Sequence, residues 1–111
     1  MQYETIRIDC SNIFDAQSFH RVFAAAFGFP SFYGANMDAW IDCMTSLDAP
    51  DDGMTSVTVG KGGIVVLQLD AAAQMRTRCR RVYDDLLDCA GFVNWRRMQS
   101  GDPPILCLSF A

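Results

Sequence analysis

Two aspartates, Asp38 and Asp42, lie four residues apart in a segment whose apolar residues recur at helical spacing. This spacing places both carboxylates on one face of a helix. No Lys or Arg lies three or four residues from either aspartate, so their own helix offers them no counter-ion. We therefore expect an unpaired acidic face, suited to the Arg and Lys side chains of a basic partner.

Paired carboxylates also serve in enzymes. Asp38 and Asp42 could act as acid and base, or could bind Mg²⁺ together with Asp70, which follows an apolar strand. No Cys or His nucleophile accompanies them, and a charged stripe is often only the solvated face of a helix. We therefore predict that the chain is not an enzyme, with a carboxylate active site as the alternative.

An aromatic loop stands directly before the two aspartates. Phe32 and Tyr33 precede Gly34, and aromatic side chains of this kind are frequent anchors at protein interfaces. Asn36 is placed to cap a helix that runs to about Leu47. The apolar face of that helix, which we expect to lie mostly in the core, comprises Met37, Trp40, Ile41, Met44 and Leu47.

Three segments are predicted to form strands, at residues 3–9, 64–69 and 105–110, and residues 55–59 could add a short edge strand. The segment 64–69 is apolar almost throughout, which is typical of a parallel strand covered on both faces. Helices are predicted between these strands. The order therefore predicts one α/β domain over residues 1–111, a small parallel sheet of about three core strands with crossover helices.

Two further helices are predicted besides the one that carries the aspartates. Asp15 should cap the first, and Gly28 should end it. The second should begin near Ala71 or Met75 and end at Gly91. The single histidine, His20, should lie on an exposed side of the first helix.

Charge is distributed unevenly along the chain. From residue 31 to 74 there are six acids and one base, whereas from 75 to 97 there are six arginines and three aspartates. An acidic middle segment disfavours nucleic acid and favours a basic partner. The arginine cluster could bind nucleic acid, but we favour a solvent-exposed face in which Arg76, Arg78, Arg80 and Arg81 are balanced by Asp84, Asp85 and Asp88.

The five cysteines are odd in number and include no C-x-x-C pair, so we expect reduced, mostly buried thiols and no zinc site. No metal or other cofactor is predicted. The N-terminus lacks the pattern of a signal peptide, and no run of eighteen apolar residues occurs. These features predict a cytoplasmic protein without a membrane segment.

The segment 29–45 resembles the signature of the barstar family. The resemblance is carried by Tyr33-Gly34-x-Asn36-x-Asp38-Ala39, followed at fixed spacing by Asp42-Cys43. The rest of the chain is similar to the family in length and in the order of its elements. The resemblance implies a barstar-like fold and an inhibitor that plugs the active site of a guanyl-preferring extracellular ribonuclease.

The resemblance also implies roles for individual residues. Asp42 would enter the phosphate pocket of the target with Asp38 beside it, and Phe32 would stack near the catalytic histidine. Gly34 and Asn36 would shape the loop and cap the helix. The complete set of expected partner contacts is Phe32, Tyr33, Gly34, Asn36, Asp38, Ile41, Asp42, Thr45 and, from the late helix, Asp85, with Asp84 as the alternative. The complex would contain one copy of each protein.

Three departures from the family pattern concern the partner. Ile41 replaces a tryptophan before the Asp-Cys pair, Phe32 replaces a tyrosine, and an insertion of about ten residues precedes the strand at 64–69. These changes leave Asp38 and Asp42 in place, and the two carboxylates could still stand in for the phosphates of RNA. They leave open an alternative partner, such as another small toxin, for a barstar-like immunity or regulatory module.

Overall fold

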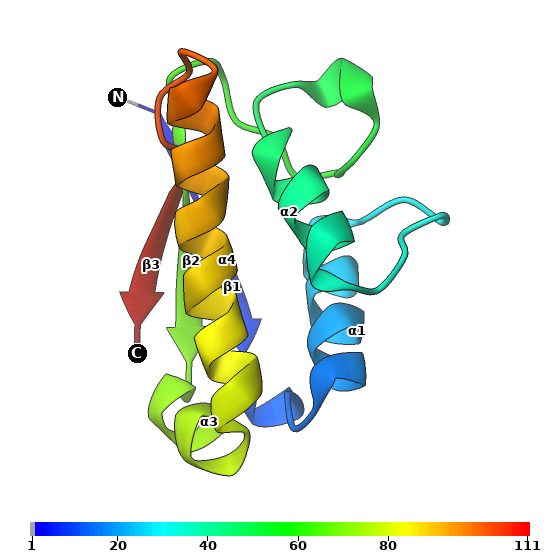
Figure 1. The fold of residues 1–111 in the computed structure, drawn as a ribbon, viewed down its shortest axis with the longest axis vertical. Helices are drawn as coiled ribbons and strands as arrows, with labels where there is room; N and C mark the ends of the chain where they lie inside the picture. The colour runs from blue at the N-terminus through cyan, green and yellow to red at the C-terminus, as the bar shows by residue number, and fades with distance from the viewer. Residues whose placement is uncertain (1) are drawn as a thin grey trace.

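The computed structural model describes residues 2–111 and shows a two-layer α/β arrangement (Figure 1). Three parallel strands, in the order β1-β2-β3, form the sheet. Their bounds are β1 Tyr3–Asp9, β2 Ile64–Asp70 and β3 Leu106–Phe110. The α-helices are α1 Ala16–Phe27, α2 Met37–Thr45, α3 Ala72–Arg78 and α4 Arg80–Gln99, with short 3₁₀ turns η1 Cys10–Asn12 and η2 Pro50–Asp52. The predicted parallel α/β fold is confirmed.

The helices cover one face of the sheet, and this differs from the expectation for the central strand. Along β2, the side chains of Val65, Leu67 and Leu69 are fully buried, whereas the intervening ones are partly exposed. On that second face Val66 lies between Thr5 and Cys107, both of which are exposed. The apolar run thus predicted the central strand correctly, but the expectation that both of its faces are covered is wrong.

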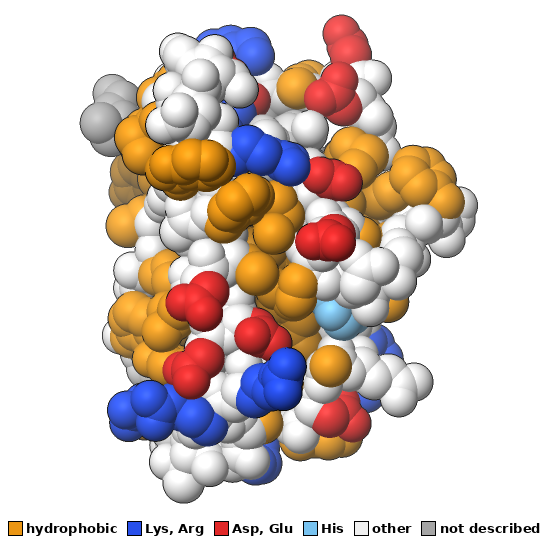
Figure 2. Space-filling view, viewed as in Figure 1, with side chains coloured by type: hydrophobic (Ala, Val, Ile, Leu, Met, Phe, Trp, Pro, Cys, Tyr) orange, Lys and Arg blue, Asp and Glu red, His pale blue; other side chains and the backbone are white. Residues whose placement is uncertain are grey.

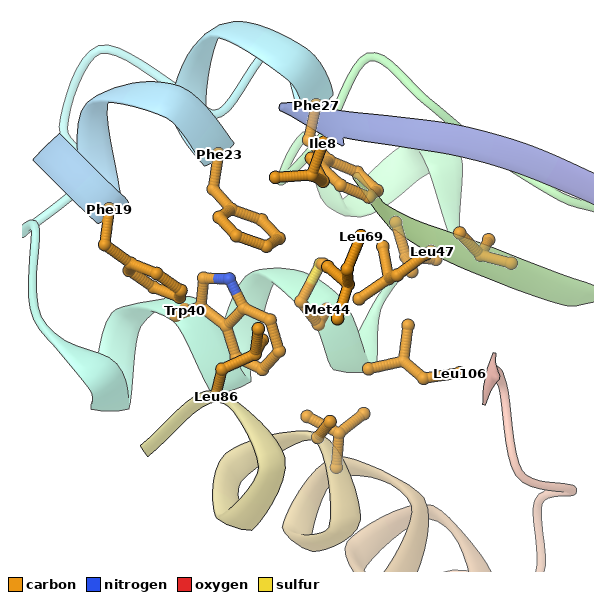
Figure 3. Close-up of a cluster of buried hydrophobic side chains, with 14 of the residues drawn as sticks. Ile8, Phe19, Phe23, Phe27, Trp40, Met44, Leu47, Leu69, Leu86 and Leu106 are labelled. Atoms are coloured by element: carbon orange, nitrogen blue, oxygen red, sulfur yellow. The ribbon is translucent and has the colours of Figure 1, made fainter. Parts of the chain in front are cut away.

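Aromatic residues of α1 and α2 fill the space between the helices and the sheet (Figure 3). Phe19, Phe23 and Phe27 recur at i, i+4 spacing on α1, so they project from one face of the helix. The Trp40 ring lies edge-on to Phe23, with ring centroids 5.6 Å apart. The predicted core residues of this segment are confirmed: Trp40, Ile41 and Met44 of α2 and Leu47 just after it are buried, and Met37 packs against the cluster.

The helix starts are formed by the predicted caps. The Asp15 carboxylate accepts from the Ser18 amide at 2.7 Å, and the Ser18 hydroxyl accepts from the Asp15 amide at 3.0 Å. Gly28 ends α1 in the left-handed conformation, with φ 63°. At the start of α2, the Asn36 side-chain oxygen accepts from the Ala39 amide at 2.8 Å. These caps fix the ends of the two helices that flank the aromatic loop.

The late helical segment differs from its prediction. The helix is interrupted at Cys79, which has non-helical backbone angles, and α4 then continues through Gly91 to Gln99. A glycine inside a helix costs only about 1 kcal/mol relative to alanine. Burial of Val93 and Arg97 beyond it outweighs that cost, so Gly91 does not end the helix.

Residues 55–59 do not form the optional edge strand. Their amides bond instead to carbonyls at helix ends: the Ser56 amide to Phe27 O at 2.8 Å and the Val59 amide to Leu47 O at 2.9 Å. The insertion therefore runs along the ends of α1 and α2 rather than along the sheet.

The arginines near the start of α4 do not form one patch. Arg78 donates to the carbonyls of Cys10 (2.9 Å) and Ile13 (2.6 Å), and Arg80 pairs with Asp84 at 3.0 Å. Arg76 and Arg81 are exposed. Of the expected salt-linked face, the pair of Arg80 with Asp84 is present, and the other arginines of the cluster lie apart from it.

The expectation for the cysteines holds in part. All five are free; Cys10 and Cys43 are buried, Cys79 and Cys89 are partly buried, and Cys107 is exposed. Burial, with help from neighbouring acids, raises the pKa of Cys10 and of Cys43 to about 11. Within residues 2–111, no cluster of His, Cys, Asp and Glu side chains is arranged to hold a metal ion. None of the helices described has the length and apolar character required to cross a membrane.

A buried ion pair joins the end of α2 to α4. Arg97 donates from both terminal nitrogens to the Asp48 carboxylate, at 3.0 and 2.8 Å, and the two side chains are only 4% and 5% exposed. Lys61 Nζ lies 3.8 Å from the same carboxylate. Burial opposes ionisation of Asp48, but the hydrogen bonds and charges of Arg97, with Lys61, outweigh it and hold the pKa of Asp48 below its usual value.

We expect Arg97→Met to lower the free energy of unfolding by about 3–5 kcal/mol, because Asp48 would be left buried without its main counter-ion. Urea denaturation at neutral pH measures this. The control is Arg80→Met, which breaks the exposed pair with Asp84 and should cost less than about 1 kcal/mol. Equal losses in the two variants would contradict a special role for the buried pair.

Candidate partner-binding site

The aromatic loop at residues 29–36 and the outer face of α2 form one continuous surface. Phe32 is 74% exposed at the tip of the loop. Asp38 is exposed on the first turn of α2, and the Asp42 side chain, one turn later, is 58% exposed. Figure 2 shows acidic side chains on the face where α2 and α4 lie side by side, with apolar side chains between them. Both predicted carboxylates thus face solvent.

The side chain of Tyr33 attaches the aromatic loop to α1. Its hydroxyl lies 2.5 Å from His20 Nδ1 on α1, and its ring packs against Phe29, with centroids 4.6 Å apart. His20 is only 6% exposed, so the expectation of an exposed histidine is wrong. Burial lowers the pKa of His20 and raises the pKa of Tyr33, because each charged form would lose solvation. The pair anchors the loop to α1.

A small pocket of about 160 Å³ opens beside Asp42. Phe32, Pro30 and Gly34 of the loop form one side, and Ala39 and Cys43 of α2 form another. Met54, from the segment 48–63 that contains the insertion, also lines the pocket. The insertion therefore supplies part of the site, which no local sequence pattern indicated.

Asp42 is not free of a counter-ion, and this corrects the expectation of an unpaired acidic face. Arg96 of α4 donates from Nη2 to Asp42 Oδ1 at 3.0 Å and to Thr45 Oγ1 at 2.9 Å. The Thr45 hydroxyl donates in turn to Ile41 O at 2.6 Å. The partner residue is 54 positions away in sequence, so helix spacing could not reveal the pair. The acidic face is partly neutralised within the chain itself.

One other predicted contact, Ile41, is placed differently from expectation. Ile41 is 8% exposed and belongs to the core, so it is corrected from a surface contact to a packing residue. Asp85 lies eleven residues before Arg96 on α4, roughly 16 Å along the helix axis. Asp85 is thus separate from the Arg96 contact to Asp42, and it stays a predicted partner contact.

The charge of Asp38 acts on the same thiol as the charges of two acids of α4. Burial raises the pKa of the Cys89 thiol, and the negative charges of Asp85, Asp88 and Asp38 raise it further. Asp84 is engaged by Arg80, which leaves Asp85 as the freer of the two candidates. The site thus has an acidic end around Asp38 and a mixed-charge end around Asp42.

Two exposed aromatics on α4 were not singled out from the sequence. Phe92 is 43% exposed and Trp95 is 52% exposed, and their rings pair with centroids 5.5 Å apart. Phe92 precedes Arg96 by one helical turn. Large exposed aromatics next to a charged site are typical of interaction surfaces.

We expect the stability of the protein to fall as the pH drops below about 6.5. Below that value the unfolded chain protonates its only histidine, whereas the buried imidazole of His20 resists protonation because its pKa is lowered. The contribution of neutral His20 to the free energy of unfolding is complete above pH 6.5, and it is lost as the pH falls towards the lowered pKa of His20 in the folded protein. Urea denaturation between pH 8 and pH 5 measures this, and His20→Gln should flatten the profile. An unchanged slope in the variant would show that another group is responsible.

Comparison with known proteins gives one family. The family model described as Barstar (barnase inhibitor) matches residues 3–105, nearly the whole chain, including the loop, α2, the insertion and α4. No protein of curated function matches. The family is one of inhibitors rather than enzymes. The chain belongs to the Barstar (barnase inhibitor) family.

Proposed function

We propose that this chain is a cytoplasmic inhibitor that occludes the active site of a basic, extracellular-type ribonuclease in a one-to-one complex. The observation that carries the proposal is the exposure of Asp38 and Asp42 on one face of α2, beside the exposed ring of Phe32. Membership of a family described as barnase inhibitors supports it.

The chemistry of the proposed complex is substitution of phosphate by carboxylate. A ribonuclease holds RNA phosphates with cationic side chains, and two carboxylates on a rigid helix can accept the same charge-assisted hydrogen bonds. The acidic surface also steers a basic partner during diffusion, which raises the association rate at low salt. α2 is well suited to this because its opposite face is held in the core.

The pocket beside Asp42 would receive one side chain of the target. A cavity of 150 Å³ is large enough for benzene, so about 160 Å³ accommodates a single ring or a guanidinium group. Phe32 and Met54 offer apolar walls, and Asp42 offers a carboxylate at the rim. An imidazole or an arginine side chain from the target's active site matches this combination.

A second candidate function is a binding module of the same fold whose partner is another small toxin. Two observations favour it: Arg96 places a positive charge beside Asp42, and Met54 of the insertion reshapes the pocket. Both change the surface that a partner meets. Inhibition of a panel of basic ribonucleases, measured with a fluorogenic RNA substrate, separates the two candidates, because the toxin module leaves all of them active.

We expect Asp42→Ala to weaken binding of the target ribonuclease by about 30-fold or more. Loss of one partner from a buried charge pair costs about 2–5 kcal/mol at interfaces, the barnase–barstar complex among them. Asp38→Ala should weaken binding less. Titration calorimetry measures the affinity, and circular dichroism checks that the fold is retained. Asp102→Ala, an equal change of charge in the loop after α4, is the control and should bind as the parent does. Unchanged affinity in Asp42→Ala would remove Asp42 from the site.

A further inference from the structure

Arg96 and Arg97 are neighbours on α4 but lie in different environments. Arg97 is 4% exposed and is held by Asp48 and by the carbonyls of Pro103 (2.9 Å) and Thr45 (2.9 Å). Arg96 is 37% exposed, and its contacts to Asp42 and Thr45 lie at the surface. The first arginine is a fixed part of the core, whereas the second can leave its contacts for solvent at little cost.

The position that Arg96 occupies is the one that a cation of a partner would need. Arg96 Nη2 binds Oδ1 of Asp42, and Asp42 also lines the pocket together with Phe32 and Met54. A basic side chain that approaches Asp42 from the partner would therefore meet a positive charge already in place. Like charges in that geometry repel, and the repulsion is strongest at low ionic strength.

We propose that Arg96 is an intramolecular competitor for the partner's cation, and that its displacement from Asp42 determines which partners bind tightly; this rests on the proposed function. A partner with one surface cation gains almost no binding free energy, because it replaces the exposed pair of Arg96 and Asp42 with another exposed ion pair. A partner gains when it engages both oxygens of Asp42 with a guanidinium, or when it buries the carboxylate. Arg96 thus selects for a deep, multiply cationic cleft against general basic surfaces.

The expected size of the effect of Arg96 on binding follows from the exposure of its ion pair with Asp42. An ion pair this exposed changes an equilibrium constant by no more than about fivefold. Removal of the positive charge next to the contact adds a long-range gain in association rate. For Arg96→Gln we therefore expect a 3- to 10-fold increase in the association rate constant with a basic ribonuclease at low salt, shrinking as salt is added.

The first experiment uses barnase as the probe and stopped-flow fluorescence to follow association. The variants are Arg96→Gln, Arg96→Lys, which keeps the charge, and Arg80→Gln, which removes the same charge from an exposed pair on the same helix. We expect a larger gain in association rate for Arg96→Gln than for Arg80→Gln, and no gain for Arg96→Lys. Slower or weaker binding of Arg96→Gln would show that Arg96 itself contacts the partner. An equal gain in Arg80→Gln would show that only net charge matters. Either result would overturn the proposal.

The second experiment does not depend on the ribonuclease. A hexa-arginine peptide is titrated at low salt while the amide NMR signals of Asp38 and Asp42 are followed. The signals of Arg96→Gln should respond at peptide concentrations several-fold lower than those of the parent or of Arg80→Gln. Identical titrations would refute competition by Arg96. If no variant binds barnase or any other basic ribonuclease but the peptide titrations differ, the proposed function fails and the role of Arg96 stands.

Discussion

The burial of Trp40 is the constraint on which the geometry of the site depends. Its ring is fully enclosed, edge-on to Phe23 of α1 and in the same cluster as Leu86 of α4. Asp38 and Asp42 each lie two residues from Trp40, a rotation of roughly 200° around the helix. Fixing Trp40 in the core therefore turns both carboxylates outward.

α4 links this surface to the stability of the domain. Successive residues on a helix point about 100° apart, so Arg97 enters the interior while Arg96 remains at the surface. Arg97 neutralises Asp48 at the end of α2, and Arg96 neutralises part of the charge on Asp42. The same helix thus holds α2 in place and moderates the acidity of its outer face.

Most of the fold could be predicted because its signals are local. Asp15 and Asn36 cap their helices as expected, and apolar runs marked the strands. The errors occur where a tertiary contact outweighs a local preference. α4 continues through Gly91 because Val93 and Arg97 are buried beyond it, and residues 55–59 bond to the ends of helices instead of to the sheet.

The sequence by itself determined the family, the α/β architecture, and the outward direction of Asp38 and Asp42, since periodicity and capping depend only on neighbours in the chain. Only the tertiary structure decided what surrounds them. Arg96 reaches Asp42 across 54 positions, and Met54 reaches the pocket from the insertion. Contacts of this kind arise from the packing of whole elements, so no spacing rule within one helix contains them.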